Sequence, residues 1–215
     1  MNTVTKSRIQ GLYAITDPSL CPNDQLLAKV EAAIQGGAKV LQYRDKTQST
    51  EVQIKMASRL VTLCRQHNVC FIINDDIQLA KTVQADGVHL GKDDSAIESA
   101  RETLGQNAII GISCYNSLQR AQQMQQAGAD YVAFGRFFPS RSKPQAPQAD
   151  LQTLIQAREQ LEIPIVAIGG INRNNAHQVI GSGADSVAVI QGVFAHETQT
   201  AITEASRQIS TQFTL

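Results

Sequence analysis

The 215-residue chain contains no tryptophan, and aromatic residues make up only 5% of it. Its 19 basic residues are balanced by 19 acidic residues, so it carries no net charge. Non-specific binding to nucleic acids or to membrane surfaces depends on an excess of basic residues, and binding to single strands depends on aromatic stacking. The composition therefore argues against nucleic-acid and membrane partners, and it favours a function carried by a localised site.

The four cysteines are far apart, and no two of them form a CxxC pair, which argues against a thiolate zinc site. Cys70 and Cys114 lie within apolar runs, where cysteine behaves as a small hydrophobic residue. Residues 1–9 are polar, and no run approaches the roughly 18 apolar residues of a membrane-spanning helix. We expect a reduced protein of the cytoplasm.

Short apolar runs alternate with longer amphipathic segments along the whole chain. The runs are residues 12–15, 39–43, 70–73, 87–90, 109–113, 131–134, 165–168 and 186–190. The segments between them, such as 24–35, 51–66, 117–126 and 150–161, have helical spacing, and several open with a capping residue (Asn116 or Ser117, and Asp150). Alternating strands and helices imply parallel pairing through right-handed crossovers. Eight units in this length predict an α/β fold, a single-domain (β/α)8 TIM barrel over residues 1–215 with its core at about 11–213.

A repeated turn supports the barrel over an open sheet. A small-residue turn that usually ends in Ala-Asp precedes every second predicted strand, with alanines at Ala38, Ala85, Ala129 and Ala184. A doubly wound open sheet gives no reason for such a repeat along its full length, whereas a closed ring of equivalent units does.

Polar residues follow the second predicted strand, at the end where barrels of this kind carry their chemistry. Side chains alternate along a strand, so Gln42, Arg44 and Lys46 are predicted to face one side. An amide and two cations suit a multiply anionic ligand. The alternative is a solvated strand end in which Arg44 pairs with a nearby carboxylate.

Carboxylates follow the third and fourth predicted strands. Asp75 and Asp94 would repel each other at neighbouring strand ends unless a cation or a proton lay between them, and Mg²⁺ needs only one or two carboxylates. The alternative makes Asp76, Asp93 or Asp94 a helix cap. Within the fourth strand, His89 is expected to face inward with its hydrogen bonds satisfied rather than to act in catalysis.

Two further loops are predicted to bind anions. Residues 135–144, after the sixth strand, form the longest connection and hold three cations and two hydroxyl groups. Glycines follow the last two strands, at Gly169, Gly170 and Gly192, where backbone amides of such barrels commonly hold a phosphate. A metal-assisted anion site facing a phosphate site fits an enzyme that joins a diphosphate ester to a second phosphorylated substrate.

Six motifs occur in this order: QYRDK, INDD, DGVHLGKDD, GISCYNS, GRFFPSRSKP and VAIGGI. Together they resemble the thiamine-phosphate synthase family over essentially residues 11–194. The resemblance implies that 4-amino-2-methyl-5-(diphosphooxymethyl)pyrimidine is condensed with a (carboxy)thiazole phosphate. The products would be thiamine monophosphate and pyrophosphate, formed by dissociative substitution with Mg²⁺ as cofactor. The partners would be these small molecules, and assembly into a homo-oligomer is left open.

The resemblance also assigns roles to residues at the matching positions. Asp75 and Asp94 would hold Mg²⁺. The catalytic groups would be Arg44, Lys46, Ser113 and Lys143. The substrate-binding set would be Gln42, Tyr43, Arg44, Asp45, Lys46, Asn74, Ser113, Ser140, Arg141, Ser142, Lys143, Gly170, Ile190 and Gln191. Within it, Ser140–Ser142, Gly170 and the Ile190–Gln191 pair would hold the thiazole phosphate.

The chain departs from the family pattern at three places. Ser140 to Lys143 replace a frequent Thr-x-Thr-Lys and keep both hydroxyl groups, and Lys92-Asp93 replace a common Gln-Glu. Gln191 stands where the family often has serine, which weakens the transfer of a phosphate contact to it. Three alternatives share the fold or the ligands: a thiazole tautomerase, a phosphosugar isomerase and a non-catalytic protein that binds phosphorylated metabolites.

Overall fold

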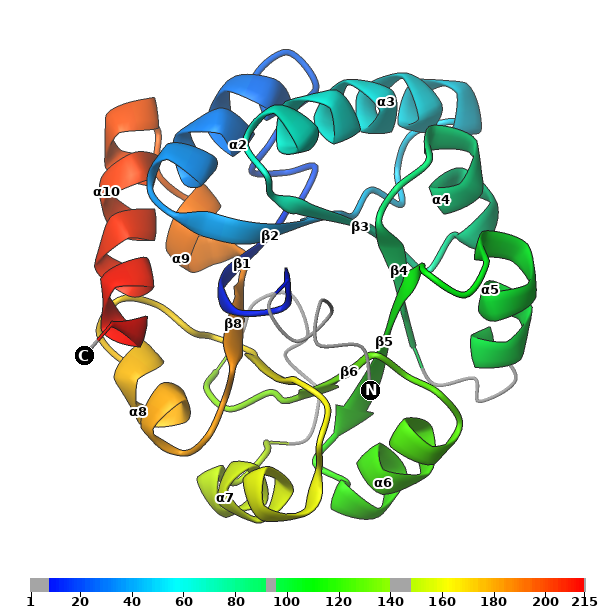
Figure 1. The fold of residues 1–215 in the computed structure, drawn as a ribbon. Coiled ribbons are helices and arrows are strands. Elements are labelled where there is room, and N and C mark those ends of the chain that lie inside the picture. Colours follow the sequence, from blue (N-terminus) through cyan, green and yellow to red (C-terminus); the bar gives the residue numbers. More distant parts are fainter. Residues whose placement is uncertain (1–7, 92–95, 140–147, 215) are drawn as a thin grey trace.

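The computed structural model describes residues 8–91, 96–139 and 148–214. Eight parallel strands close into a barrel, with β1 paired to both β2 and β8, and helices surround it (Figure 1). The strands are β1 (Gly11–Ile15), β2 (Ala38–Tyr43), β3 (Cys70–Asn74), β4 (Gly87–Leu90), β5 (Ile109–Tyr115), β6 (Tyr131–Phe134), β7 (Ile165–Ile168) and β8 (Ser186–Val189). The helices are α2 (Leu26–Gln35), α3 (Thr50–Gln66), α4 (Ile77–Val83), α5 (Ala96–Leu104), α6 (Leu118–Gln126), α7 (Leu151–Gln160), α8 (Ala176–Gly181), α9 (Gln191–Phe194) and α10 (Gln199–Ser210), followed by the 3₁₀ turn η1 (Thr211–Phe213). The predicted (β/α)8 TIM barrel is confirmed.

The strand bounds differ from the prediction by at most two residues. β5 continues through Tyr115, two residues beyond the apolar run, because it stays paired with β6 there. β8 stops at Val189, one residue short, because Ile190 is already the N-cap of α9.

Two predicted helix caps are confirmed, and one polar residue has a different role. The side chains of Ser117 and Asp150 accept hydrogen bonds from the first turns of α6 and α7. Asn116 instead joins the loop after β5 to α7, because its side-chain oxygen accepts from the Asp150 N–H and from Thr153 Oγ1.

The core has an inner and an outer layer. Inside the barrel, buried residues from all strands but β4 pack together, and Tyr13 and Tyr131 are the largest of them. A Cβ atom at Gly111 would overlap the Tyr131 ring, so the glycine provides the space that this ring occupies. The outer layer lies between the strands and the helices and is rich in Leu, Ile, Val and Ala. Alternating side chains therefore supply two layers, as expected for strands that are covered on both faces.

The Ala-Asp repeat has a structural role at the amino ends of the strands. Asp130, just before β6, donates its N–H to the Ile110 carbonyl oxygen and accepts the Ile110 N–H on Oδ2, both at 2.8 Å. Arg101 lies 2.8 Å from the same carboxylate oxygen. Two other aspartates of the repeat make the same contacts. The Asp86 carboxylate accepts the Phe71 N–H and pairs with Arg8. The Asp185 carboxylate accepts the Ile165 N–H and pairs with Arg158. Each aspartate thus holds the start of the preceding strand in place, namely β3, β5 or β7.

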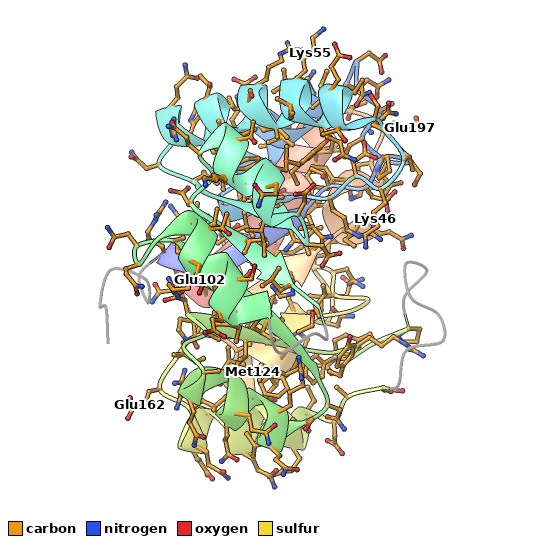
Figure 2. All side chains as sticks on the ribbon, turned by 90° about the vertical axis from the view of Figure 1, so that its right-hand side faces the viewer. Lys46, Lys55, Glu102, Met124, Glu162 and Glu197 are labelled. Atoms are coloured by element: carbon orange, nitrogen blue, oxygen red, sulfur yellow. The ribbon has the colours of Figure 1, made fainter. Side chains whose placement is uncertain are left out.

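Figure 2 separates the two ends of the barrel. Lys46, which follows β2, and Glu197, which follows α9, lie toward the right-hand side, whereas Glu162, which precedes β7, lies at the opposite end. The repeated aspartates therefore lie at the amino ends of the strands, and the carboxyl ends of the strands lie at the opposite end of the barrel. None of the helices within the described ranges has the length and apolarity needed to cross a lipid bilayer.

Replacing Asp130 with alanine should destabilise the barrel without affecting the opposite end. The change leaves the Ile110 N–H and the Arg101 guanidinium without their carboxylate, which we expect to cost about 2–3 kcal/mol of the free energy of unfolding. Urea denaturation should show a lower midpoint at an unchanged slope. The matched control is Lys39→Ala, because Lys39 occupies the aspartate position of the first repeat and is exposed. A loss of similar size in the control would contradict this role of the aspartate.

Candidate active site

A cavity of about 590 Å³ opens at the carboxyl ends of the strands. Tyr13 and Tyr131 form part of its lining from inside the barrel, and loops after the strands form its rim. The predicted site residues among its lining are Gln42, Arg44, Lys46, Asn74, Asp75, Ser113, Gly170, Ile190 and Gln191. The parallel barrel therefore brings these residues, from five strands, to a single cavity.

The end of β2 presents cations to the cavity. Gln42, Arg44 and Lys46 all line it, as their alternation predicts. The backbone N–H of Arg44 donates to Oγ1 of the buried Thr16 at 2.9 Å, which ties the end of β2 to the end of β1. Arg44 forms an ion pair with Asp17 at 3.8 Å, as the alternative interpretation predicts, and this separation is beyond hydrogen-bonding range. The donors of Arg44 are therefore placed to receive an anion.

Two predicted substrate contacts in the same segment are not part of the cavity lining. Tyr43 points to the opposite side of β2 and is buried in the outer core layer. Oδ1 of Asp45 accepts the backbone N–H groups of Thr47 and Gln48 at 2.8 and 3.3 Å, so it shapes the loop. Both residues line a second, smaller cavity of about 190 Å³ beside this loop.

Asp75 lies at the rim beside the β2 cations. Its Oδ2 is 2.8 Å from both Lys46 Nζ and Asn74 Nδ2, and its backbone N–H donates to the His89 carbonyl oxygen. Asp75 has a φ of +62°, a conformation that aspartate tolerates better than most residues. Asp76, in contrast, caps α4 through the Leu79 N–H, as the alternative interpretation predicts.

The donor chemistry at Asp75 fits a hard divalent cation. Its side chain is 46% exposed and therefore accessible to a cation. Within the described residues no group of three or more His, Cys, Asp and Glu side chains is assembled for a metal. Mg²⁺ does not need one, because it binds through one or two carboxylates and completes its shell with water and phosphate oxygens. The second predicted ligand, Asp94, lies outside the described residues.

A chain of five side chains crosses the interior of the barrel below the cavity. Gln42 Nε2 donates to the Tyr13 hydroxyl at 2.8 Å, and the Tyr13 and Tyr131 hydroxyls are 2.9 Å apart. His89 Nδ1 lies 2.9 Å from the Tyr131 hydroxyl, and His89 Nε2 lies 2.9 Å from Ser113 Oγ. The prediction that His89 faces inward with its hydrogen bonds satisfied is therefore confirmed. Burial raises the pKa of both phenols, which keeps them protonated near neutral pH.

Glycines allow the loops after β6, β7 and β8 to pack against one another on the other side of the cavity. Gly170 has a φ of +66°, and a Cβ atom there would overlap the Pro139 carbonyl oxygen. A Cβ at Gly192 would come within 2.7 Å of the Ile171 carbonyl oxygen. Both glycines line the cavity, so backbone amides border it here.

Comparison with known proteins gives this arrangement a family. The family model described as thiamine monophosphate synthase matches residues 12–193. The chain belongs to this family. It is 52% identical over 206 residues to the thiamine-phosphate synthase of Alcanivorax borkumensis, covering 96% of this chain and 95% of the relative. It is 54% identical over 202 residues to that of Nitrosococcus oceani, covering 94% and 93%.

A solved structure agrees with this assignment. The thiamine phosphate pyrophosphorylase from Pyrococcus furiosus superposes with a TM-score of 0.86 at 35% identity and 98% coverage of both chains. The protein is thus a thiamine-phosphate synthase family member, a transferase of thiamine biosynthesis with a TIM-barrel fold. The 3-hexulose-6-phosphate synthase structure, at 17% identity and a TM-score of 0.65, shares the fold alone.

Sequence reasoning missed several residues that line this thiamine-phosphate synthase cavity. Tyr13 and Tyr131 lie within apolar runs, and from sequence alone such aromatics cannot be told from ordinary core residues. Further polar lining residues are Tyr115, at the end of β5, and Asn172, Arg173, Asn174 and His196, in the loops after β7 and α9. Arg136, one of the three cations of the loop predicted to bind anions, also lines the cavity. Asn172 directly follows the Gly169-Gly170-Ile171 segment, and this was the one signal that could have identified it.

One predicted part of the site lies outside the described residues. Ser140, Arg141, Ser142 and Lys143 all belong to it, together with the metal ligand Asp94. Their assignments stay predictions, which rest on the family resemblance.

Gly170→Ala should strongly lower the rate of the transferase reaction, beyond the loss of stability that a positive φ explains. The added methyl group must displace the loop after β6, and misplacing a substrate group by about 1 Å can lower a rate about 100-fold. The matched control is Gly128→Ala, where φ is +94° but no atom lies within 4 Å of the new Cβ. We expect the control to lose about 1–2 kcal/mol of stability and to keep its activity. Steady-state assays and urea denaturation of both variants test this expectation, and equal loss of activity in the two would contradict it.

Proposed function

We propose that this chain condenses 4-amino-2-methyl-5-(diphosphooxymethyl)pyrimidine with a (carboxy)thiazole phosphate to give thiamine monophosphate and pyrophosphate. A carboxylated thiazole would also release its carboxylate as CO₂. The observation that carries the proposal is the shared cavity, in which Arg44, Lys46 and Asp75 lie on one side and Gly170 on the other. Its volume of about 590 Å³ is within the usual range for small-molecule sites. A cationic side and a glycine-lined side suit a diphosphate and a monophosphate held in one space.

The pyrimidine diphosphate would bind on the side of β2 and β3. The planar fork of Arg44 and the ammonium of Lys46 suit the diphosphate oxygens, and Lys143 would add a third cation. Gln42 and Ser113 line the cavity deeper in the barrel and would contact the ring, with Asn74 beside the diphosphate. Arg44 and Lys46 line the cavity before any ligand binds, so they would stabilise the departing pyrophosphate at little reorganisation cost.

Asp75 and Asp94 are the proposed ligands of Mg²⁺. Mg²⁺ held by these carboxylates would supply charge neutralisation for the diphosphate leaving group. Lys46 contacts Asp75 at 2.8 Å and is next to the proposed diphosphate position, so one ammonium group borders both the metal ligand and the leaving group. This arrangement supports a role for Lys46 in catalysis beyond simple binding.

The thiazole phosphate would bind on the opposite side. Gly170, Ile190 and Gln191 line that part of the cavity, and the hydroxyl groups of Ser140 and Ser142 would complete the phosphate site. Gln191 would offer an amide donor where the family often has a hydroxyl group. Arg141 belongs to the same proposed segment.

The residue types suit a dissociative substitution. The pyrimidine C–O bond breaks with its electron pair leaving on pyrophosphate, and the resulting cation is stabilised by the amino group of the ring. The thiazole nitrogen then attacks this carbon. Such a route needs alignment of two substrates and stabilisation of the leaving group, and it needs no enzymatic nucleophile. Apolar lining residues such as Ile15 and Ile168 would limit access of water to the cation.

Two accompanying expectations are part of the same proposal. The cytoplasm, where phosphorylated metabolites are made and used, suits these substrates. Assembly into a homo-oligomer stays open, and the chain's partners are the two small molecules.

Incubation with both substrates and Mg²⁺ tests the proposed function. We expect thiamine monophosphate and pyrophosphate in equal amounts, detected by chromatography and a coupled pyrophosphate assay. Binding of both substrates in calorimetry without pyrophosphate release would instead indicate a non-catalytic binding protein. Aromatisation of a thiazole tautomer without condensation would indicate the tautomerase alternative.

Asp75→Asn and Asp94→Ala should each raise the Mg²⁺ concentration needed for half-maximal rate and lower the maximal rate. Loss of one preorganised charge partner typically costs about 3 kcal/mol of barrier, or roughly 100-fold in rate. The matched control is Asp76→Asn, because this neighbouring carboxylate caps α4 and does not line the main cavity. The control should keep its Mg²⁺ dependence and nearly all of its stability, because asparagine also caps helices well. Full activity of the unmodified protein after exhaustive EDTA treatment would contradict the metal assignment.

A further inference from the structure

The hydrogen-bonded chain below the cavity ends at two groups that border the cavity from opposite walls. Gln42 comes from β2 and Ser113 from β5, and Tyr13, Tyr131 and His89 connect them. Tyr13 and Tyr131 are fully buried, and Gln42 is only 3% exposed. These three side chains are shielded from bulk water, whereas His89 and Ser113 are half-buried and border the cavity. The protons of the two buried hydroxyl groups are therefore shared with their neighbours in the hydrogen-bonded chain.

Each hydroxyl group has one proton to donate, so the direction of the chain can be followed from one end. Gln42 donates through Nε2 to the Tyr13 hydroxyl, which leaves the Tyr13 proton to be donated to Tyr131. The Tyr131 proton is then directed to the remaining neighbour, Nδ1 of His89. A histidine that accepts at Nδ1 carries its proton on Nε2, and this proton is donated to Ser113 Oγ.

Both ends of the chain are left with one complementary group for a ligand. No described residue donates a hydrogen bond to the Gln42 side-chain oxygen. This oxygen is also not completely covered by protein atoms, so a ligand can reach it. Ser113 Oγ accepts from His89, which leaves its own proton to be donated. Since both side chains line the cavity, the chain presents an acceptor on one wall and a donor on the other.

We propose that Tyr131 and His89 are positioning residues that fix this direction. They direct the His89 Nε2–H toward Ser113 Oγ, and Ser113 is thereby kept as a donor opposite the Gln42 acceptor. The ligand that fits is a heteroaromatic ring with an exocyclic amine and an unprotonated ring nitrogen, since the amine donates to Gln42 and the nitrogen accepts from Ser113. This inference rests on the proposed function, in which an aminopyrimidine diphosphate occupies this part of the cavity.

The tautomer can be measured on the free protein without any assay of activity. ¹⁵N-histidine labelling with long-range ¹H–¹⁵N correlation distinguishes Nε2–H from Nδ1–H imidazole, and loss of signals in His89→Gln identifies the ring among the four histidines. We expect His89 to carry its proton on Nε2. A proton on Nδ1 would mean that the chain runs in the opposite direction, and it would overturn the proposal.

Variants test whether the direction matters for the substrate. Tyr131→Phe removes the donor to His89, so the KM for the pyrimidine diphosphate should rise about tenfold while the KM for the thiazole phosphate stays unchanged. His89→Leu should show the same split. His89→Gln should restore much of the affinity, because its amide can still donate toward Ser113.

Ile109→Val is the matched control for a purely structural effect. Ile109 is buried inside the barrel at the start of β5, does not line the cavity, and should lose stability without changing either KM. Equal changes in both KM values for Tyr131→Phe, or no recovery in His89→Gln relative to His89→Leu, would overturn the inference. If the unmodified protein releases no pyrophosphate, the proposed function fails, and the tautomer measurement still tests the direction of the chain.

Discussion

The parallel direction of the eight strands is the constraint on which the site depends. In a closed parallel barrel all carboxyl ends meet at one rim, so residues that follow different strands become neighbours there. Asn74 at the end of β3 pairs in register with His89 of β4, and the Asp75 N–H binds the His89 carbonyl oxygen. Lys46, which follows β2, reaches the same carboxylate. Segments far apart in the chain thus combine into one charged rim without any long excursion of the backbone.

The two ends of the barrel divide stability and chemistry between them. At the amino ends, Asp86, Asp130 and Asp185 each satisfy a backbone N–H of the preceding strand and pair with an arginine. At the carboxyl ends, Arg44 and Asp17 are 3.8 Å apart, and the Lys46–Asp75 pair is 2.8 Å apart but more exposed to solvent than the amino-end pairs. The better-buried pairs hold the strands together, whereas the exposed charges at the rim are accessible to a ligand.

Residues inside the barrel contribute both to the stability of the core and to the site at the carboxyl ends of the strands. Tyr13 and Tyr131 pack edge to face, with ring centroids 6.2 Å apart, so they fill the core as other aromatic pairs do. Their hydroxyl groups also belong to the chain that runs from Gln42 to Ser113. A buried hydroxyl must find a partner, and here the partners are groups at the bottom of the cavity. Core packing therefore constrains how the site can orient its donors and acceptors.

Much of the fold could be predicted from sequence because it depends on local patterns. The apolar runs, the capping residues Ser117 and Asp150, and the repeated Ala-Asp turn all report on nearest neighbours along the chain. The same is true of the alternation that places Gln42 and Arg44 on one side of β2. What the repeat does was not predictable, because the Asp130 carboxylate acts on a strand that begins some twenty residues earlier.

The sequence by itself therefore determined the strand order, the inward or outward direction of side chains within a strand, and the family. Tertiary structure alone decided which polar residues meet. It placed the Asp45 carboxylate in hydrogen bonds within its own loop, and it joined Tyr13, Tyr131 and His89 below the cavity. The physical reason is that alternation follows from bond geometry within a single strand, whereas a hydrogen bond across the barrel depends on closure, register and the space left by residues such as Gly111.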